Sequence, residues 1–179
     1  SWRATATLDT YLREEGIVGI QGIDTRALTR HVRDRGAQEG IISTVEADAR
    51  RLADRARVLP GLTGRDLVNE VTVAGPHGWS EGDWDLRRGY QPAPVARYRV
   101  VAFDSGIKSN ILRRLATLGC ALDVVPARTP VEAVLERRPH GIFLANGPGD
   151  PEAVDYLVRT VRQLIGKVPN FGICLGNQI

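Results

Sequence analysis

The residues best suited to chemistry lie at the end of the printed chain, around Cys174. Gly172 and Gly176 flank this cysteine, and the pattern predicts a strand, a sharp turn and the start of a helix. Such a turn presents a nucleophile at the carboxyl edge of a parallel sheet. The helix amino-terminus behind it favours the thiolate, which is the attacking species, and the amide of Leu175 is the natural first donor of an oxyanion hole. A cysteine used only for packing is the alternative, but it would not require glycines on both sides.

A second candidate site is the loop 146–151, Asn-Gly-Pro-Gly-Asp-Pro, which follows a predicted strand. In a parallel sheet this loop lies at the same carboxyl edge as Cys174. Gly147 and Gly149 leave backbone amides open toward a ligand. Asp150 and Pro151 also suit a helix cap, so a plain turn before a well-capped helix explains part of the pattern.

A cysteine hydrolase needs a base, usually a histidine, and none of the three histidines suits this role. His140 precedes its predicted strand while Cys174 follows its own, which separates them by roughly 17 Å for five-residue strands. We expect His31 and His77 to lie outside the sheet domain. The base is therefore expected to follow Ile179, and a chain ending there is expected to be inactive and poorly stable.

The region from residue 99 onward alternates strands and helices, which predicts parallel pairing with right-handed crossovers. This is a doubly wound α/β sheet, with Thr129 as a helix cap and Pro130 at the first helical position. The expected strands are 99–104, 121–126, 141–145 and 168–173, and the expected helices are 107–118, one beginning at 129–130 and one spanning 150–165.

The sequence before this region predicts a smaller α/β domain, of which residues 1–75 are part. An interdomain linker is predicted over 76–97, before the sheet domain at 98–179. Glycines and prolines are frequent in 76–97. Trp79 and Trp84 in that linker are expected to pack at the junction, the alternative being a partner surface. The expected elements of the first part are helices at 7–15, 25–35 and 46–59 and a short strand at 39–45.

The composition is that of an ordinary globular protein, with 42% hydrophobic residues and a formal net charge of +3 over 179 residues. The arginines are scattered among acidic residues, so we expect no nucleic-acid partner. No apolar run is long enough to span a bilayer. Two cysteines make no disulfide framework, and Cys120 is expected to be a buried small hydrophobe. No residue cluster predicts a metal site. The chain lacks methionine and stops inside a motif, so we expect an internal fragment.

Taken together, the motifs resemble the class I glutamine amidotransferases and, more narrowly, the small subunit of carbamoyl-phosphate synthase. Anthranilate synthase and GMP synthetase amidotransferase domains resemble residues 99–179 but lack the preceding domain. The resemblance covers essentially the whole chain and rests on the blocks 22–30, 66–68, 104–111, 146–151 and 174–178.

The resemblance implies a truncated flavodoxin-like sheet in which Cys174 attacks the side-chain amide of glutamine, giving a glutamyl thioester and ammonia. Leu175 and Gly147 would hold the oxyanion, and Gly149 and Gln178 would help bind glutamine. Ammonia would pass to a separate large subunit, which uses ATP, Mg and bicarbonate to make carbamoyl phosphate for arginine and pyrimidine synthesis. This implies a cytoplasmic protein with no cofactor of its own, whose triad histidine and glutamate lie farther along.

Two positions depart from the family pattern. Asn177 stands where a histidine is usual, and Ser105 stands where an aromatic residue is usual. We expect Asn177 to be tolerated, and Ser105 to leave either a small void or a polar contact. The alternative functions are an amidotransferase for another synthase, a cysteine peptidase on a similar sheet, or a scaffold subunit with a dead site.

Overall fold

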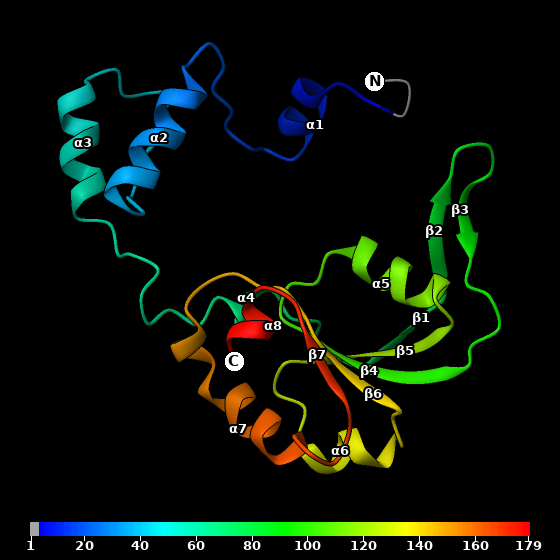
Figure 1. Ribbon diagram of the computed structural model, residues 1–179. Helices are drawn as coiled ribbons and strands as arrows, with labels where there is room; N and C mark the ends of the chain where they lie inside the picture. Colours follow the sequence, from blue (N-terminus) through cyan, green and yellow to red (C-terminus); the bar gives the residue numbers. More distant parts are fainter. Residues whose placement is uncertain (1–3) are drawn as a thin grey trace. The chain divides into compact units, whose positions relative to one another are not determined.

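The computed structural model describes residues 4–179 and divides at Gly61 into two compact units (Figure 1). The described part of the first unit contains three helices, α1 (Leu8–Glu14), α2 (Thr25–Arg35) and α3 (Ala49–Arg57). Their amino ends are capped by the side chains of Thr7, Asp24 and Asp48, each accepting a backbone N–H.

The helices predicted in this unit are thus confirmed to within a few residues, but the predicted strand at 39–45 is wrong. Residues 39–45 have no strand assignment, and the described residues 4–61 include no other strand to pair with them. A single extended segment cannot complete a hydrogen-bonded ladder. None of the described residues of this unit is fully buried.

The second unit is built on a five-stranded sheet with the order β1-β5-β4-β6-β7. The strands β4, β5, β6 and β7 pair in parallel, which confirms the doubly wound arrangement predicted from the alternating pattern. The strands are β1 (His77–Trp79), β4 (Tyr98–Asp104), β5 (Cys120–Pro126), β6 (Gly141–Leu144) and β7 (Asn170–Gly172).

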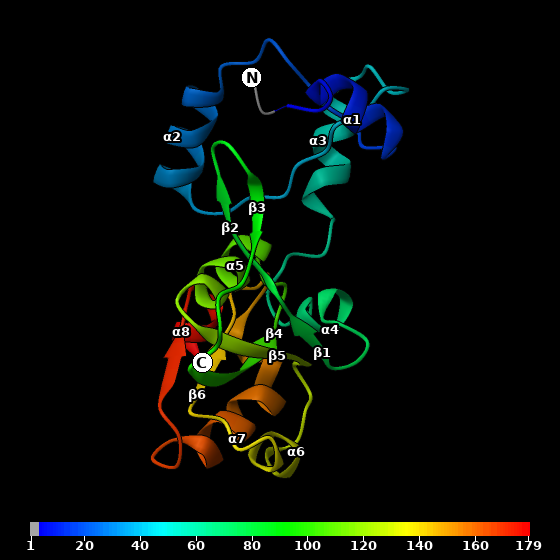
Figure 2. The same cartoon turned by 90° about the vertical axis from the view of Figure 1, so that its right-hand side faces the viewer.

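Helices cover both faces of this sheet, as Figures 1 and 2 show. On one face, α5 (Ser109–Thr117) packs Leu112 and Ala116 against Val124 and Phe143. On the other face lie α6 (Val131–Glu136), the 3₁₀ turn η1 (Pro151–Val154) and α7 (Asp155–Leu164). Leu157 and Leu164 of α7 are fully buried there. The two apolar layers hold the carboxyl ends of the strands in a fixed register, and the candidate site is built on those ends.

Residues 76–97, for which an interdomain linker is predicted, are folded into the second unit. β1 pairs antiparallel with β5, and β2 (Glu81–Asp85) and β3 (Gly89–Pro92) form a hairpin. The hairpin packs on α5, where Asp83 N–H donates to Thr117 Oγ1 at 2.8 Å (Figure 2). Trp79 packs against the apolar layer on the α5 face. A linker was predicted because glycines and prolines are frequent here and the strands are too short to show a clear alternation of apolar and polar residues.

One predicted helix start is wrong in detail. Pro130 is the N-cap of α6, not its first helical residue, and Thr129 makes no cap bond. The Thr129 hydroxyl donates instead to the carbonyl of Pro126 at 2.7 Å. Asp150 does cap the next helical segment, as predicted, although that segment begins as the 3₁₀ turn η1.

Two further short helices complete the second unit, α4 (Val68–Val71) and α8 (Leu175–Gln178). Both lie toward the carboxyl ends of the strands in Figure 1. α8 follows β7 directly after Cys174, so the nucleophile candidate sits between the last strand and this helix.

Candidate active site

Cys174 adopts a backbone conformation that L-residues rarely take, with φ 55° and ψ −117°. Strain of this kind persists only where the surroundings impose it, and it is found at functional turns. The flanking glycines are required: a Cβ on Gly172 would lie 2.0 Å from the carbonyl oxygen of Gly176, and one on Gly176 would lie 2.1 Å from that of Leu144. The predicted sharp turn is therefore present, and its glycines serve close backbone approach.

Hydrogen bonds tie this turn to the end of the neighbouring strand β6. Ile173 N–H donates to Leu144 O at 3.1 Å, and Gly176 N–H donates to Ala145 O at 3.1 Å. Leu175 is buried, while Cys174 is exposed. The turn thus holds the cysteine at the surface while its neighbours anchor it in the core.

The loop 146–151, which we call the glycine loop, packs against the turn that carries Cys174. A Cβ on Gly147 would lie 2.3 Å from the carbonyl oxygen of Ser105 and 2.9 Å from Cδ2 of Leu175. The hydrogen bonds found within the described chain include none from the amide N–H groups of Gly147, Gly149 or Leu175. The structure therefore brings Gly147 against Leu175, the residue directly after the cysteine, whereas Gly149 lies against Arg65 and Leu67.

Asn146, the first residue of the predicted loop, joins the glycine loop to the loop after β4. Its Nδ2 donates to Gly106 O at 2.9 Å, and its Oδ1 accepts from Lys108 N–H at 3.2 Å. Asp104, at the end of β4, accepts from the N–H groups of Gly106 and Ile107 at 2.9 and 2.8 Å. Asn146 and Asp104 are polar residues at the ends of buried strands, and this position is the sequence feature that indicates a role for them at the site.

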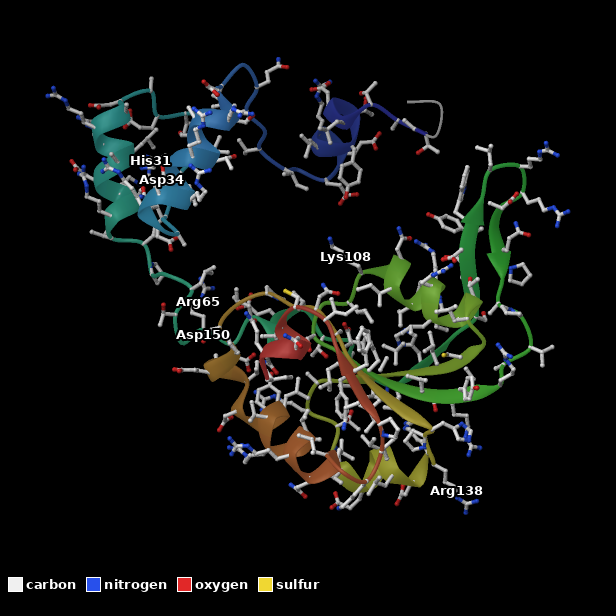
Figure 3. All side chains as sticks on the ribbon, in the orientation of Figure 1. His31, Asp34, Arg65, Lys108, Arg138 and Asp150 are labelled. Atoms are coloured by element: carbon white, nitrogen blue, oxygen red, sulfur yellow. The ribbon has the colours of Figure 1, made fainter. Side chains whose placement is uncertain are left out.

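Asp150 connects the glycine loop to the segment before α4. Its carboxylate accepts from Glu152 N–H at 3.0 Å and from Gly64 N–H at 3.1 Å. These two bonds, the one from Glu152 first, hold the pKa of Asp150 below its ordinary value. Figure 3 places Asp150 and Arg65 close together, whereas Arg138 lies at the other end of the sheet. The bond to Gly64 spans 86 positions and has no local sequence signal.

The remaining predicted positions are also located. Gln178 and Asn177 are exposed on α8. Ser105 is 1% exposed, and its hydroxyl has no hydrogen-bond partner among the described residues. Ser105 was expected to leave either a small void or a polar contact, and the polar contact is not found.

The histidines of the second unit lie far from Cys174. His140 is at the amino edge of the sheet, as predicted, where its Nδ1 accepts from Arg99 N–H at 2.9 Å. The prediction that His77 lies outside the sheet domain is wrong, because it begins β1 and pairs with Val124. β1 and β7 are opposite edge strands, four strand spacings or about 19 Å apart, so His77 does not reach Cys174 either.

We expect the two thiols to differ in reactivity. Cys120 is half-buried, and burial raises the pKa of its thiol, whereas Cys174 is exposed. Because the thiolate is the reacting form, iodoacetamide at pH 7.5 should alkylate Cys174 at least about tenfold faster than Cys120. Peptide mass spectrometry over a time course measures both rates, and equal rates would contradict the difference in environment.

Two family models match the chain. Residues 100–179 match "Glutamine amidotransferase class-I", and residues 1–42 match "Carbamoyl-phosphate synthase small chain, CPSase domain". No helix among the described residues is long and apolar enough to cross a membrane. No group of three or more His, Cys, Asp or Glu in residues 4–179 is arranged to hold a metal ion.

Similar proteins named carbamoyl phosphate synthase small chain match along the whole chain. The one from Syntrophotalea carbinolica is 57% identical over 180 residues, covering 100% of this chain and 48% of the relative. Those from Thioalkalivibrio sulfidiphilus and Aquifex aeolicus are 48% and 46% identical over 181 and 179 residues, each again covering 100% of this chain and 48% of the relative. The chain thus spans about half the length of the curated relatives it matches.

Proposed function

We propose that this chain, which belongs to the carbamoyl-phosphate synthase small chain family, carries the nucleophile and oxyanion donors of a glutaminase. The observation that supports this most directly is the strained turn at Cys174, next to the open amides of Leu175 and Gly147. Acyl transfer requires a nucleophile beside N–H donors for the oxyanion, and we assign that role to the amides of Leu175 and Gly147.

In the proposed reaction, Cys174 Sγ attacks the side-chain amide carbon of glutamine. The carbonyl oxygen becomes an oxyanion that accepts from the N–H groups of Leu175 and Gly147, and collapse breaks the carbon–nitrogen bond. The nitrogen takes up the proton that the thiol has given up and leaves as ammonia, and the product is a glutamyl thioester on Cys174. Water then hydrolyses the thioester to glutamate and restores the thiol.

Substrate placement is part of the same proposal. Gly149 offers an open amide in the loop, and Gln178 is exposed on α8 close in sequence to the nucleophile. We assign both to glutamine binding. Asn177 is exposed one residue earlier and is not assigned a step.

The proposal extends to a partner. The ammonia would be delivered to a carbamoyl-phosphate synthase large subunit, which would use bicarbonate, ATP and Mg to form carbamoyl phosphate for arginine and pyrimidine synthesis in the cytoplasm. The small-chain family match over residues 1–42 supports a subunit that works with a large chain. The alternatives are an amidotransferase that serves a different synthase and a purely scaffolding subunit. Assays of glutamine hydrolysis and carbamoyl phosphate formation by the complex would distinguish these from the proposed function.

Residues 1–179 alone are expected to show no glutamine turnover above background. Neither His77 nor His140 reaches Cys174, so the thiol has no histidine base within the second unit. Ammonia release from millimolar glutamine, compared with the full-length protein in its complex, measures this. Appreciable turnover by residues 1–179 would show that our placement of the base is wrong.

A further inference from the structure

Four side chains from three separate segments of the second unit form one cluster at the carboxyl side of the sheet. Asp66 and Asn69 come from the α4 segment, Arg128 follows β5, and Tyr156 lies in the first turn of α7. We call these four residues the Asp66 cluster. The proposed glutaminase chemistry uses none of them.

The Asp66 carboxylate is the centre of the cluster. Its Oδ2 pairs with Arg128 Nη2 at 3.0 Å, while its Oδ1 accepts from Tyr156 O–H at 3.1 Å and from Asn69 N–H at 3.0 Å. Arg128 also donates from Nε to Asn69 Oδ1 at 3.0 Å and lies over the Tyr156 ring at 3.7 Å. A planar guanidinium that is paired, bonded and stacked at once has little freedom to move.

The protonation state of Tyr156 supports this arrangement. Burial, and then the neighbouring Asp66 carboxylate, raise the pKa of Tyr156 to about 12. The phenol therefore stays protonated across the working pH range and continues to donate to Asp66. Both oxygens of the Asp66 carboxylate therefore keep their hydrogen-bond partners.

The segment that carries Asp66 touches the glycine loop directly. A Cβ on Gly149 would lie 3.3 Å from Arg65 O and 3.4 Å from Leu67 Cβ, the residues on either side of Asp66. Gly64 N–H donates to the Asp150 carboxylate at 3.1 Å. On the far side of the loop, Tyr156 holds the helix that follows η1. The glycine loop is therefore in contact with the Asp66 segment at Gly149 and Asp150, and the helix that follows the loop is bonded to Asp66 through Tyr156.

The other end of the same segment is anchored in the sheet. Val68 is fully buried, Thr72 Oγ1 donates to Asp104 O at 2.7 Å, and Val73 N–H donates to the Asp104 carboxylate at 2.8 Å. Thr72 Oγ1 also accepts from Ala127 N–H at 3.0 Å. A segment held this firmly can transmit a fixed position to the loop it touches.

We propose that the Asp66 cluster positions the glycine loop, so that the amides of Gly147 and Gly149 face the substrate in the geometry that glutamine hydrolysis needs. This inference rests on the proposed function. Asp66 is a positioning residue here, because it acts through the loop and does not touch the reacting atoms. Oxyanion donors work only when they are pre-organised, so a small displacement of the loop has a large kinetic effect.

The test is Asp66→Asn in the full-length protein assembled with its partner. Asparagine keeps an oxygen to accept from Tyr156 and Asn69 but places an amide NH2 group against Arg128, which removes the ion pair and the hydrogen bond to Oδ2. We expect kcat/KM for glutamine to fall on the order of tenfold, with both a lower kcat and a higher KM. Arg128→Lys, which keeps the charge but loses the stacked fork, should give an intermediate loss.

The matched control is Asp83→Asn. Asp83 pairs with Arg114 at 2.9 Å, the same kind of surface ion pair in a somewhat more exposed setting, but on the β2–β3 hairpin and α5, away from the loop. We expect it to lower Tm by no more than Asp66→Asn does, because Asp83 is more exposed, and to leave the glutaminase constants unchanged. Unchanged kinetics in Asp66→Asn, or equal kinetic losses in both variants, would overturn the proposal.

Hydrogen exchange separates this inference from the proposed function. Glu152 N–H and Ala153 N–H donate to Asp150, so their protection reports on the loop whether or not glutamine is hydrolysed. Exchange in peptides spanning residues 150–156 should rise several-fold in Asp66→Asn and stay unchanged in Asp83→Asn. If the wild-type protein is inactive but shows this exchange pattern, the glutaminase function is refuted and the positioning role of the Asp66 cluster is retained. If exchange in Asp66→Asn is unchanged, the positioning role is refuted.

Discussion

Replacing Cys174 with alanine in the full-length protein is expected to reduce glutamine hydrolysis by about four to six orders of magnitude. The thiol is the only group in the proposed mechanism that forms a bond to the substrate, and loss of a nucleophile removes nearly the whole rate enhancement of such an enzyme. The small side chain of alanine leaves the strained turn and its glycine contacts unchanged. Steady-state glutaminase assays with the assembled complex measure the loss.

Cys120→Ala is the matched control for this variant. Cys120 begins β5 and is half-buried, far from the carboxyl ends of the strands, so its removal should leave kcat within about twofold and cost only a modest amount of stability. In the Cys174→Ala complex, carbamoyl phosphate synthesis from added ammonium should continue, because only the glutamine-derived supply is lost. Intact glutamine hydrolysis by Cys174→Ala would rule out every amidotransferase function considered for this chain.

Gly147→Ala is expected to lower kcat for glutamine hydrolysis by about a hundred- to a thousandfold. The added Cβ would lie 2.3 Å from the backbone oxygen of Ser105, a distance no side-chain rearrangement can relieve. The loop must shift, and the Gly147 amide moves away from the oxyanion position. Loss of one oxyanion donor costs about this much in related chemistry.

Gly141→Ala provides the comparison. Gly141 begins β6, and a Cβ there would meet its nearest atom, Pro169 O, at 3.7 Å, which is an ordinary contact. This variant should keep both Tm and kcat close to wild type. A Gly147→Ala protein with wild-type kcat would show that the oxyanion is held elsewhere, and a Gly141→Ala protein with an equal loss would show that any glycine replacement in β6 or its loop disturbs the site.

The extent to which the fold could be predicted differs between the two units. In the second unit the strand–helix alternation predicted the parallel strands, because apolar runs separated by amphipathic helices leave few other topologies. The strands β1, β2 and β3 were missed, since they are short and lie among glycines and prolines. In the first unit the three helices were predicted to within a few residues, but the short segment 39–45 was predicted as a strand and has no partner.

The candidate site shows the same division. The glycine spacing around Cys174 predicted the sharp turn, because only glycine permits the close approaches of Gly172 to Gly176 and of Gly176 to Leu144. The loop at 146–151 was predicted to lie at the same sheet edge, which the parallel pairing of β6 with β7 requires. The position of His140 before its strand, at the amino edge of the sheet, also excluded it as a base.

The sequence by itself thus determined the chemistry-bearing residues and the edge of the sheet on which they meet, because these follow from local pattern and from the rule that parallel strands end together. Only the tertiary structure decided what supports them. The bond from Gly64 to Asp150, the meeting of Asp66 with Arg128 and Tyr156, and the place of His77 in the sheet join residues far apart along the chain. Such pairings depend on how the whole unit packs, and no local periodicity encodes them.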